Sequence, residues 1–387
     1  MRIAHLSIGA FPPVFFKYGG AVQRWVGELA CEQVRRGHSV TVFSPGLANG
    51  SAYVRGVKLA HVKCRASQPW AHIEFQVRAL VRLMRASDKP DVIHFHSEPE
   101  GAILSGWSSA KRVLSYNNFY FRGGRERPFY RVYRRLIQQF DLLLPCSQYC
   151  RSASSEYWRL PASRLLVSPC GVDVEIFRPD ESSGRAERQA LGLVGPLILY
   201  VGRICRQKGT DTLLAAYPRI RAKHPNARLV LAGPFEQFDG HDPSAQRVWE
   251  RLISAAGAVH LGPVSDERLP RLYNAADVFV MPTAELEMFG MAALEAEACG
   301  VPVVASDHGG LRETVPTECG SRFPPGDASA LAEAVGDLLE DNARRLKCGE
   351  RARAHALKFS WRRVAADLDE LYEASAMAPR DRDASER

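Results

Sequence analysis

The stretch that decides the fold is ELEMFGMAALEAEACGVPVVAS, residues 285–306. Apolar residues recur at helical spacing after Gly290, and Gly300 stands where a C-cap glycine is usual. A short helix is therefore predicted from about Gly290 to Cys299. The apolar run PVVAS that follows is typical of a buried strand in a parallel sheet. A helix leading directly into such a strand indicates an α/β protein.

Two carboxylates of this stretch suggest a binding site. Glu295 falls in the second helical turn, and Glu287 lies in the loop after the apolar run at 277–283. In a continuous helix they would be ~12 Å apart, too far to share a proton or a metal ion. An elongated ligand along the helix N-terminus would suit them, with hydroxyls at its ends and negative charge between. The backbone N–H groups facing that charge would be those of Phe289, Gly290 and Met291. A nucleotide sugar has this shape; the alternative is that Glu287 caps the helix and Glu295 is solvated.

Composition indicates an ordinary globular protein with two domains. A chain of 387 residues is too long for one typical core. Its 46% hydrophobic and 24% charged residues fall in the globular range. The net charge of +8 would suit a nucleic acid, an anionic membrane or an anionic ligand. Because the arginines are spread along the chain, a mildly basic surface is favoured, and no nucleic-acid partner is expected.

Cysteine usage and the absence of long apolar runs favour a cytoplasmic protein. The nine cysteines are scattered, and the nearest pair, Cys146 and Cys150, lacks zinc-site spacing. We expect reduced thiols in the core. The N-terminus MRIAHLSIGAFPP predicts a first strand rather than a signal peptide. No apolar run reaches the ~18 residues of a membrane span.

Strand-like runs alternate with amphipathic helical segments along the chain. The predicted strands are residues 2–8, 39–45, 57–63, 91–96, 112–116, 141–147, 196–202, 228–234, 258–264, 277–283 and 302–306. Such alternation predicts parallel sheets with helices on both faces and ligands beyond the carboxyl ends of the strands. Turn residues between Ser168 and Gln189 mark the boundary. We expect domains at 1–170 and 190–357, with a last helix at about 360–376 packing back onto the first domain.

Five ordered segments resemble glycosyltransferase family 4, a family of retaining nucleotide-sugar glycosyltransferases. The most specific is the pair Glu287 and Glu295, separated by seven residues. The supporting segments are 17–42 (KYGGAVQRWVGELACEQVRRGHSVTV), 167–173 (VSPCGVD), 200–214 (YVGRICRQKGTDTLL) and 262–283 (GPVSDERLPRLYNAADVFVMPT). The resemblance covers residue 1 to about 376. It implies the GT-B fold: two Rossmann-like, doubly wound α/β domains facing across a deep cleft, the first binding the acceptor and the second the nucleotide sugar.

Two cations are candidates for the donor diphosphate. Arg203 and Lys208 follow the strand at 196–202 and precede a helix near Thr210, so they converge with a helix N-terminus where a diphosphate fits. A solvated pair of basic residues is the alternative. The resemblance implies that they neutralise the leaving nucleoside diphosphate in an enzyme that needs no metal or other cofactor.

Further roles follow only from the resemblance. Glu287 would hold donor-sugar hydroxyls and Glu295 the ribose hydroxyls, while Glu297 is expected to be solvated. UDP is the expected nucleotide, carried as UDP-glucose or UDP-N-acetylglucosamine. The loop from Gly262 to Val264 would then form a wall for uracil. Retention would arise from attack on the same face, with the departing phosphate helping to deprotonate the acceptor, so no nucleophile is assigned.

The first domain offers weaker candidates. Gly19 and Gly20 would let backbone N–H groups approach the donor, although a plain tight turn is as good an interpretation. Many relatives carry a histidine after the strand at 112–116, where this chain has Asn117. An amide orients a hydroxyl but is no base near neutral pH. His96 would line the cleft, whereas His94 is expected to be buried and hydrogen-bonded.

The acceptor is indicated by conflicting signals. Aromatic residues alternate with arginines in Phe119–Leu136, which would suit a phosphorylated acceptor or an anionic bilayer and favour a lipid or polysaccharide acceptor. Glu98 and Glu100 would instead pair with a cationic aminocyclitol. Over its whole length the chain also resembles bacterial enzymes that attach glucose or N-acetylglucosamine to 2-deoxystreptamine in aminoglycoside antibiotic biosynthesis. The expected activity is therefore hexosyl transfer to 2-deoxystreptamine. A UDP-sugar 2-epimerase is the remaining enzymatic alternative.

Overall fold

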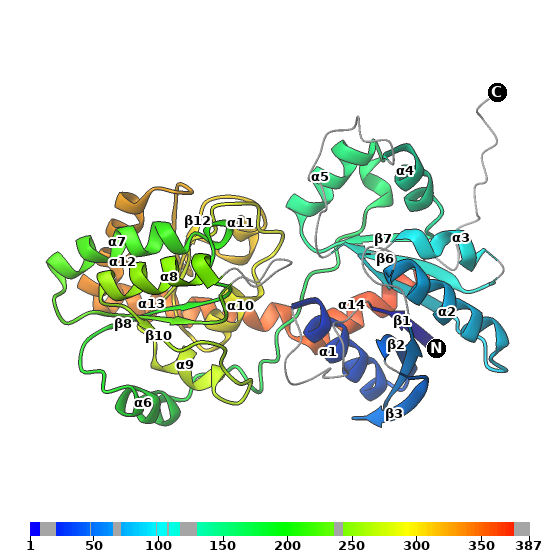
Figure 1. The fold of residues 1–387 in the computed structure, drawn as a ribbon, viewed down its shortest axis with the longest axis horizontal. Coiled ribbons are helices and arrows are strands. Elements are labelled where there is room, and N and C mark those ends of the chain that lie inside the picture. Colours follow the sequence, from blue (N-terminus) through cyan, green and yellow to red (C-terminus); the bar gives the residue numbers. More distant parts are fainter. Residues whose placement is uncertain are drawn as a thin grey trace. The chain divides into compact units, whose positions relative to one another are not determined.

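The computed structural model describes residues 1–7, 21–46, 48–64, 71–97, 99–106, 108–116, 130–235 and 243–374 (Figure 1). The chain forms two compact units, each with its own sheet. Unit 1 comprises Met1–Pro169 and Trp361–Arg387, and unit 2 comprises Cys170–Ser360.

Unit 1 contains a seven-stranded sheet in the order β3-β4-β2-β1-β5-β6-β7. The strands are β1 (Arg2–Leu6), β2 (Ser39–Gly46), β3 (Gly50–Val54), β4 (Val57–Lys63), β5 (Val92–His96), β6 (Lys111–Tyr116) and β7 (Leu142–Pro145). All neighbours are parallel except β3, which pairs antiparallel with β4. Without β3, the order of the six parallel strands is the 3-2-1-4-5-6 of a doubly wound fold. The order reverses between β1 and β5.

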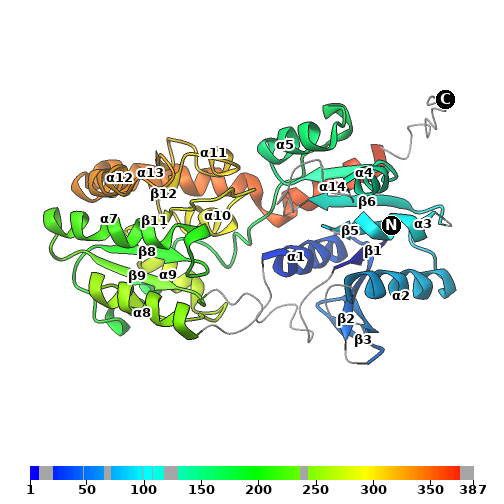
Figure 2. The same cartoon turned by 45° about the horizontal axis from the view of Figure 1, so that its top comes forward.

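The helices of unit 1 are α1 (Ala21–Arg35), α2 (Ala71–Arg85), α3 (Ala102–Ser105), α4 (Tyr130–Gln138), α5 (Gln148–Trp158) and α14 (Trp361–Ala374), with short turns η1 (Pro99–Gly101) and η2 (Ala162–Arg164). The C-terminal helix α14 packs on α1 (Figure 2). The Trp25 and Trp361 ring centroids lie 6.4 Å apart, and Arg36 donates to Asp369 at 2.6 Å. Residues far apart in sequence thus build one core.

Unit 2 contains a six-stranded parallel sheet in the order β10-β9-β8-β11-β12-β13, which is again 3-2-1-4-5-6. Its strands are β8 (Leu197–Val201), β9 (Arg228–Ala232), β10 (Val259–His260), β11 (Val278–Met281), β12 (Val303–Ser306) and β13 (Gly320–Phe323). Here the order reverses between β8 and β11.

Helices cover both faces of this sheet (Figure 2). On one face α7 (Thr210–Lys223) contacts α8 (Pro243–Ala256) and α12 (Ala328–Glu340). On the other, α9 (Leu269–Ala275) contacts α6 (Glu181–Ala190) and α10 (Met291–Ala298), which packs on α13 (Asn342–Ala356). The remaining elements are η3 (Arg206–Lys208), α11 (Leu311–Thr314) and η4 (Leu357–Phe359). Strands buried on both faces explain the apolar runs in the sequence.

Every predicted strand is present, although the run at 258–264 forms only the two residues of β10. Two strands, β3 and β13, were missed. β3 lies at the sheet edge with mostly exposed side chains, so no apolar run marks it. The nine cysteines all lie within the described residues and none forms a disulfide; all but the half-buried Cys64 are buried, which confirms the expectation of core thiols. None of the described helices combines the length and apolar character that crossing a bilayer requires.

Candidate active site

Two candidate residues of unit 2 meet at the point where its strand order reverses. Lys208 ends η3, the turn after β8, and Glu287 lies in the loop after β11. Lys208 Nζ is 2.5 Å from Glu287 Oε2, and the side chains are 28% and 17% exposed. Ligands of doubly wound sheets bind at the carboxyl edge of this point. A cation and a carboxylate that sequence analysis assigned to one donor site are therefore in contact there.

The loops that carry these two side chains are locked together by backbone contacts. Gly209 has φ +69°, and a Cβ there would lie 1.7 Å from Pro282 O. Glycine is thus required both for the conformation and for the close approach. Ala284 and Glu285 each donate a backbone N–H to Gln207 O, at 3.1 and 3.2 Å. Lys208 is flanked by residues that fix it against the loop of Glu287.

A pair of glycines holds the other side of the Glu287 loop. Gly310 donates its N–H to Glu287 O at 2.8 Å, and a Cβ on Gly310 would lie 2.0 Å from Met288 O. Gly309 has φ +62°, and a Cβ there would lie 2.4 Å from Glu287 O. These two glycines form a turn after β12. Only the fold shows that the turn supports the backbone of Glu287.

The helix that carries Glu295 begins and ends as predicted. Gly290 is its N-cap with φ +100°, Met291 is its first residue, and Phe289 just before it is 5% exposed. Glu295 is 4% exposed and accepts a hydrogen bond from Tyr273 Oη at 2.9 Å. Glu295 is therefore not a solvated side chain. No pattern in the sequence had indicated Tyr273, because it lies on a different helix.

Glu297 corrects the sequence analysis, which expected a solvated carboxylate. It is fully buried, and its Oε2 lies 2.8 Å from His355 Nδ1. Burial, with a smaller contribution from Glu318, raises the pKa of Glu297 well above its usual range. Burial also lowers the pKa of His355 to about 4. Burial therefore favours the neutral forms of both groups, and α10 buries one glutamate against α9 and the other against α13.

Arg203 and Val264 lie in loops at the same edge of the sheet. Arg203 is exposed in the turn after β8, and its backbone O accepts from Tyr200 Oη at 2.6 Å. Val264 is half-buried in the loop after β10. Gly262 O in that loop accepts from Gly233 N–H at 2.8 Å. The second of these bonds connects the carboxyl ends of the neighbouring strands β9 and β10.

In unit 1 the two histidines of β5 are both buried. His94 bonds Tyr372 Oη and Ser115 Oγ, both at 2.7 Å, as expected for a hydrogen-bonded core histidine. His96 is only 2% exposed, and its Nε2 is 2.9 Å from His5 Nδ1. The other candidates of this unit, Gly19, Gly20, Glu98 and Asn117, lie outside the described residues.

Glu100 lies just beyond β5, in η1. Tyr133 Oη donates to Glu100 Oε1 at 2.5 Å, and His72 Nε2 is 3.6 Å from the same oxygen. Within the described part of the chain, Glu100 Oε2 has no hydrogen-bond partner. The side chain is 11% exposed. One buried carboxyl oxygen near the carboxyl end of β5 is thus without a partner in the described part of the chain.

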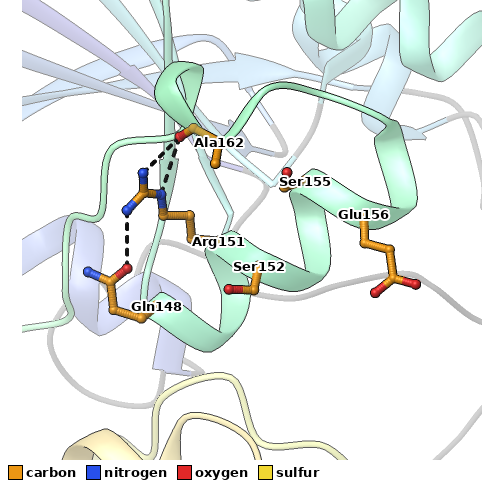
Figure 3. Close-up of a pocket in the computed structure, with 6 residues that line it drawn as sticks. All are labelled: Gln148, Arg151, Ser152, Ser155, Glu156 and Ala162. Atoms are coloured by element: carbon orange, nitrogen blue, oxygen red, sulfur yellow. Dashed lines mark hydrogen bonds between the residues drawn. The ribbon is translucent and has the colours of Figure 1, made fainter.

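Unit 1 also has an open pocket on α5, and none of the residues that line it is a predicted site residue (Figure 3). It is lined by Gln148, Arg151, Ser152, Ser155, Glu156 and Ala162. Arg151 donates to Ala162 O and to Gln148 Oε1 along its wall. This arginine ties α5 to η2.

Two clusters bring three potential metal ligands within 4.8 Å of one another: Glu297 with Cys319 and His355, and His5 with His94 and His96. In the first, burial raises the pKa of Cys319 to about 12 and raises the pKa of Glu297 above its usual range, so burial opposes the deprotonated forms that would bind a cation. In the second, both His94 nitrogens are already hydrogen-bonded. Neither cluster presents a converging set of free lone pairs.

Comparison with known proteins agrees with this geometry. Residues 18–176 match Glycosyltransferase Family 4, and residues 185–355 match Glycosyl transferases group 1. The D-inositol 3-phosphate glycosyltransferase of Xylanimonas cellulosilytica is 30% identical over 412 residues, covering 96% of each chain. The GDP-mannose-dependent alpha-(1-6)-phosphatidylinositol monomannoside mannosyltransferase of Mycolicibacterium smegmatis is 29% identical over 375 residues, 93% of this chain and 96% of that one.

Solved structures share the fold. Sucrose-phosphate synthase from Thermosynechococcus elongatus superposes with a TM-score of 0.80 at 24% identity, covering 96% of this chain and 98% of that one. Anabaena HepE in complex with UDP and glucose superposes with a TM-score of 0.78 at 20% identity, covering 97% and 100%. The fold is therefore GT-B, as predicted, and the protein is a glycosyltransferase of the hexosyl-transferring class. The chain belongs to glycosyltransferase family 4, with a group 1 domain in its second half.

Proposed function

We propose that this glycosyltransferase transfers a hexose from UDP-glucose or UDP-N-acetylglucosamine, with retention and without a metal, to a hydroxyl of a cyclitol. The best candidate acceptor is the aminocyclitol 2-deoxystreptamine. The observation that carries the donor part is the 2.5 Å contact between Lys208 Nζ and Glu287 Oε2 at the point where the strand order reverses.

In the proposed mechanism, Lys208 and Glu287 separate when the donor binds. Each of them then contacts a different part of the donor. As the bond from the anomeric carbon to the diphosphate breaks, negative charge develops on the phosphate oxygens. Lys208 and Arg203 would neutralise that charge. Glu287, released from Lys208, would accept hydrogen bonds from sugar hydroxyls. Glu295, held by Tyr273, would accept from the ribose.

Two cations at the diphosphate would make a divalent metal unnecessary. We therefore expect EDTA to leave turnover unchanged and added Mg²⁺ to change it less than about twofold. Retention is tested by proton NMR of the first product, in which an α-linked glucose is expected from the α-linked donor. A β-linked product would contradict the same-face mechanism.

The acceptor part rests on Glu100. One of its oxygens is held by Tyr133, and the other has no partner among the described residues. A largely buried carboxylate with one oxygen that lacks a partner suits an ammonium group of an aminocyclitol, because opposite charges attract strongly where water is partly excluded. The Glu100→Gln variant should therefore raise the KM for 2-deoxystreptamine more than the KM for an uncharged cyclitol.

The relatives favour a second candidate. Their names describe an inositol phosphate glycosyltransferase and a GDP-mannose-dependent mannosyltransferase that acts on a phosphatidylinositol mannoside. Inositol and 2-deoxystreptamine are both six-membered carbocyclic polyols, so a related site would suit either. An inositol phosphate would require cations at the acceptor rather than a carboxylate.

One panel separates these candidates. The purified chain is incubated with UDP-glucose, UDP-N-acetylglucosamine or GDP-mannose, and with 2-deoxystreptamine, myo-inositol 1-phosphate or vesicles containing phosphatidylinositol. Released nucleotide and product mass are measured. Glycosylated 2-deoxystreptamine from a UDP-sugar supports the proposal. Transfer only from GDP-mannose, or only to the inositol acceptors, would replace it with the second candidate.

A further inference from the structure

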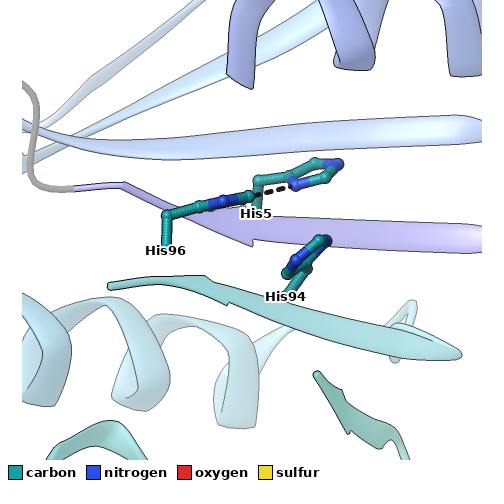
Figure 4. Close-up of side chains that lie close together, drawn as sticks. All are labelled: His5, His94 and His96. Carbon is teal, nitrogen blue, oxygen red and sulfur yellow. Dashed lines mark hydrogen bonds between the residues drawn. The ribbon is translucent and has the colours of Figure 1, made fainter. Parts of the chain in front are cut away.

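A chain of three buried side chains ends where the strand order of unit 1 reverses. His96 is the last residue of β5, and His5 lies in the neighbouring strand β1. Their rings are joined by a hydrogen bond of 2.9 Å (Figure 4). On its other side, His5 Nε2 lies 2.7 Å from Gln33 Oε1 of α1. Gln33, His5 and His96 therefore form one continuous hydrogen-bonded path towards the carboxyl edge of the sheet.

The donors and acceptors of this path are set by its first member. An amide oxygen only accepts, so His5 must carry its proton on Nε2. Burial lowers the pKa of His5 to about 4, so the ring is neutral near pH 7 and its Nδ1 is a lone pair. The Nε2 of His96 must then donate to His5 Nδ1. Burial, together with the positive charge that His94 and His5 would carry, lowers the pKa of His96 well below its usual range, so this ring is neutral too.

The consequence is a buried acceptor atom that has no hydrogen-bond donor among the described residues. His96 Nδ1 is left as a lone pair, and nothing in the described ranges hydrogen-bonds to it. A buried acceptor atom without a donor has lost its hydrogen bonds to water without forming a replacement, which is energetically unfavourable. Trp25 Nε1, on a ring whose centroid is 4.9 Å from that of His96, also has no partner in the described part of the chain. A hydroxyl group contains both the donor and the acceptor that these two atoms leave open.

We propose that His96 Nδ1 accepts a hydrogen bond from a hydroxyl of the acceptor substrate, and that His5 and Gln33 are positioning residues that hold the lone pair there. The assignment of the acceptor to unit 1 rests on the proposed function. The ligand recognised is a neutral hydroxyl of a polyol, which distinguishes this contact from the carboxylate contact at Glu100. If the Gln33 side-chain amide were rotated by 180°, its N–H would donate to His5 Nε2. His5 Nδ1 would then donate to His96 Nε2, and His96 would carry its proton on Nδ1.

The tautomer is measured without any substrate. The full chain is labelled with ¹⁵N-histidine, and long-range ¹H–¹⁵N spectra are recorded near pH 7, with His96→Asn identifying the His96 signals. We expect a protonated Nε2 and an unprotonated Nδ1. A proton on Nδ1, or a charged ring, would overturn the proposal. Because no substrate is needed, this measurement decides the path even if the proposed function fails.

The positioning role of His5 is tested with two variants whose side chains have similar size and shape. In His5→Asn the side-chain Oδ1 takes the place of Nδ1 and still accepts from His96, whereas His5→Leu has nearly the same outline and no acceptor. We expect His5→Asn to keep kcat/KM for the acceptor within about threefold of wild type and His5→Leu to lose about tenfold, the worth of one hydrogen bond. A control is His61→Leu, a histidine of the same sheet that bonds Ser44 outside this path.

The substrate for these rates is whichever cyclitol of the panel is glycosylated. If none is glycosylated, hydrolysis of UDP-glucose, with water as acceptor, provides the rate. Equal losses in His5→Asn and His5→Leu would show that only the ring's bulk matters and would overturn the positioning role. That role is also excluded if His5→Leu behaves like His61→Leu, or if a crystal structure with bound acceptor shows His96 Nδ1 bonded to an internal water only.

Discussion

The close approach of Gly209 to Pro282 makes a quantitative prediction. In Gly209→Ala the new Cβ would start 1.7 Å from Pro282 O, so the loop after β11 must move by roughly an ångström or more. The φ of +69° alone costs alanine about 1 kcal/mol. Displacing the loop breaks the two hydrogen bonds from Ala284 and Glu285 to Gln207 O, at about 1 kcal/mol each. We expect Gly209→Ala to lower the free energy of unfolding by about 3 kcal/mol.

Gly192→Ala is the matched control. Gly192 also has a left-handed φ, +64°, but a Cβ there meets nothing within 4 Å. It should therefore cost only the conformational term, about 1 kcal/mol. Both variants are compared with wild type by urea unfolding followed by circular dichroism, and UDP affinity is measured by calorimetry. Gly209→Ala should also weaken UDP binding, because Lys208 precedes it. If the two variants lose equal stability, the loops are not locked at this glycine and the construction of the site is wrong.

Three further predictions concern charge and protonation. Lys208→Ala should lower kcat about 100-fold, the usual loss when a group that stabilises a developing anion is removed. The unfolding temperature should be nearly unchanged. Near-normal turnover would exclude Lys208 from neutralising the leaving diphosphate. Because the folded-state pKa of Glu297 is raised, its burial should cost stability progressively as pH rises above about 4.3. Glu297→Gln should flatten that loss when urea unfolding is compared at increasing pH above this value. Burial lowers the pKa of His5 to about 4 in the folded state, compared with about 6.5 in the unfolded chain. As pH falls from 6.5 to about 4, the unfolded chain therefore binds more protons at this histidine, and the free energy of unfolding should fall by ~3 kcal/mol. A pH-independent difference between wild type and His5→Asn over this range would refute that assignment.

Elements of regular structure were largely predictable because their signals are local. The helix of residues 291–298 is bounded by Gly290 and Gly300, whose φ values of +100° and +75° are those a glycine adopts most readily. Doubly buried strands such as β8 and β11 are marked by their own apolar runs. The edge strand β3 has no such run, because its pairing with β4 is its main contact.

The candidate site was only partly predictable. Lys208 and Glu287 were identified from separate stretches, but their contact depends on β8 and β11 being neighbours in the sheet. The expectation that Glu297 is solvated was wrong because helical periodicity cannot say what lies on the far side of the helix. Here α13, which follows much later in the chain, places His355 against it.

By itself, the sequence determined the α/β class, the order of the elements, the family and the pair of glutamates that we propose for the donor site. These depend on residue spacing along a single segment, which the geometry of helices and strands translates directly into faces and ends. Tertiary structure alone decided which side chains are neutral, which loops are held together and where a lone pair is left open. Those properties depend on burial and on partners brought from distant parts of the chain, and neither has a signature in local spacing.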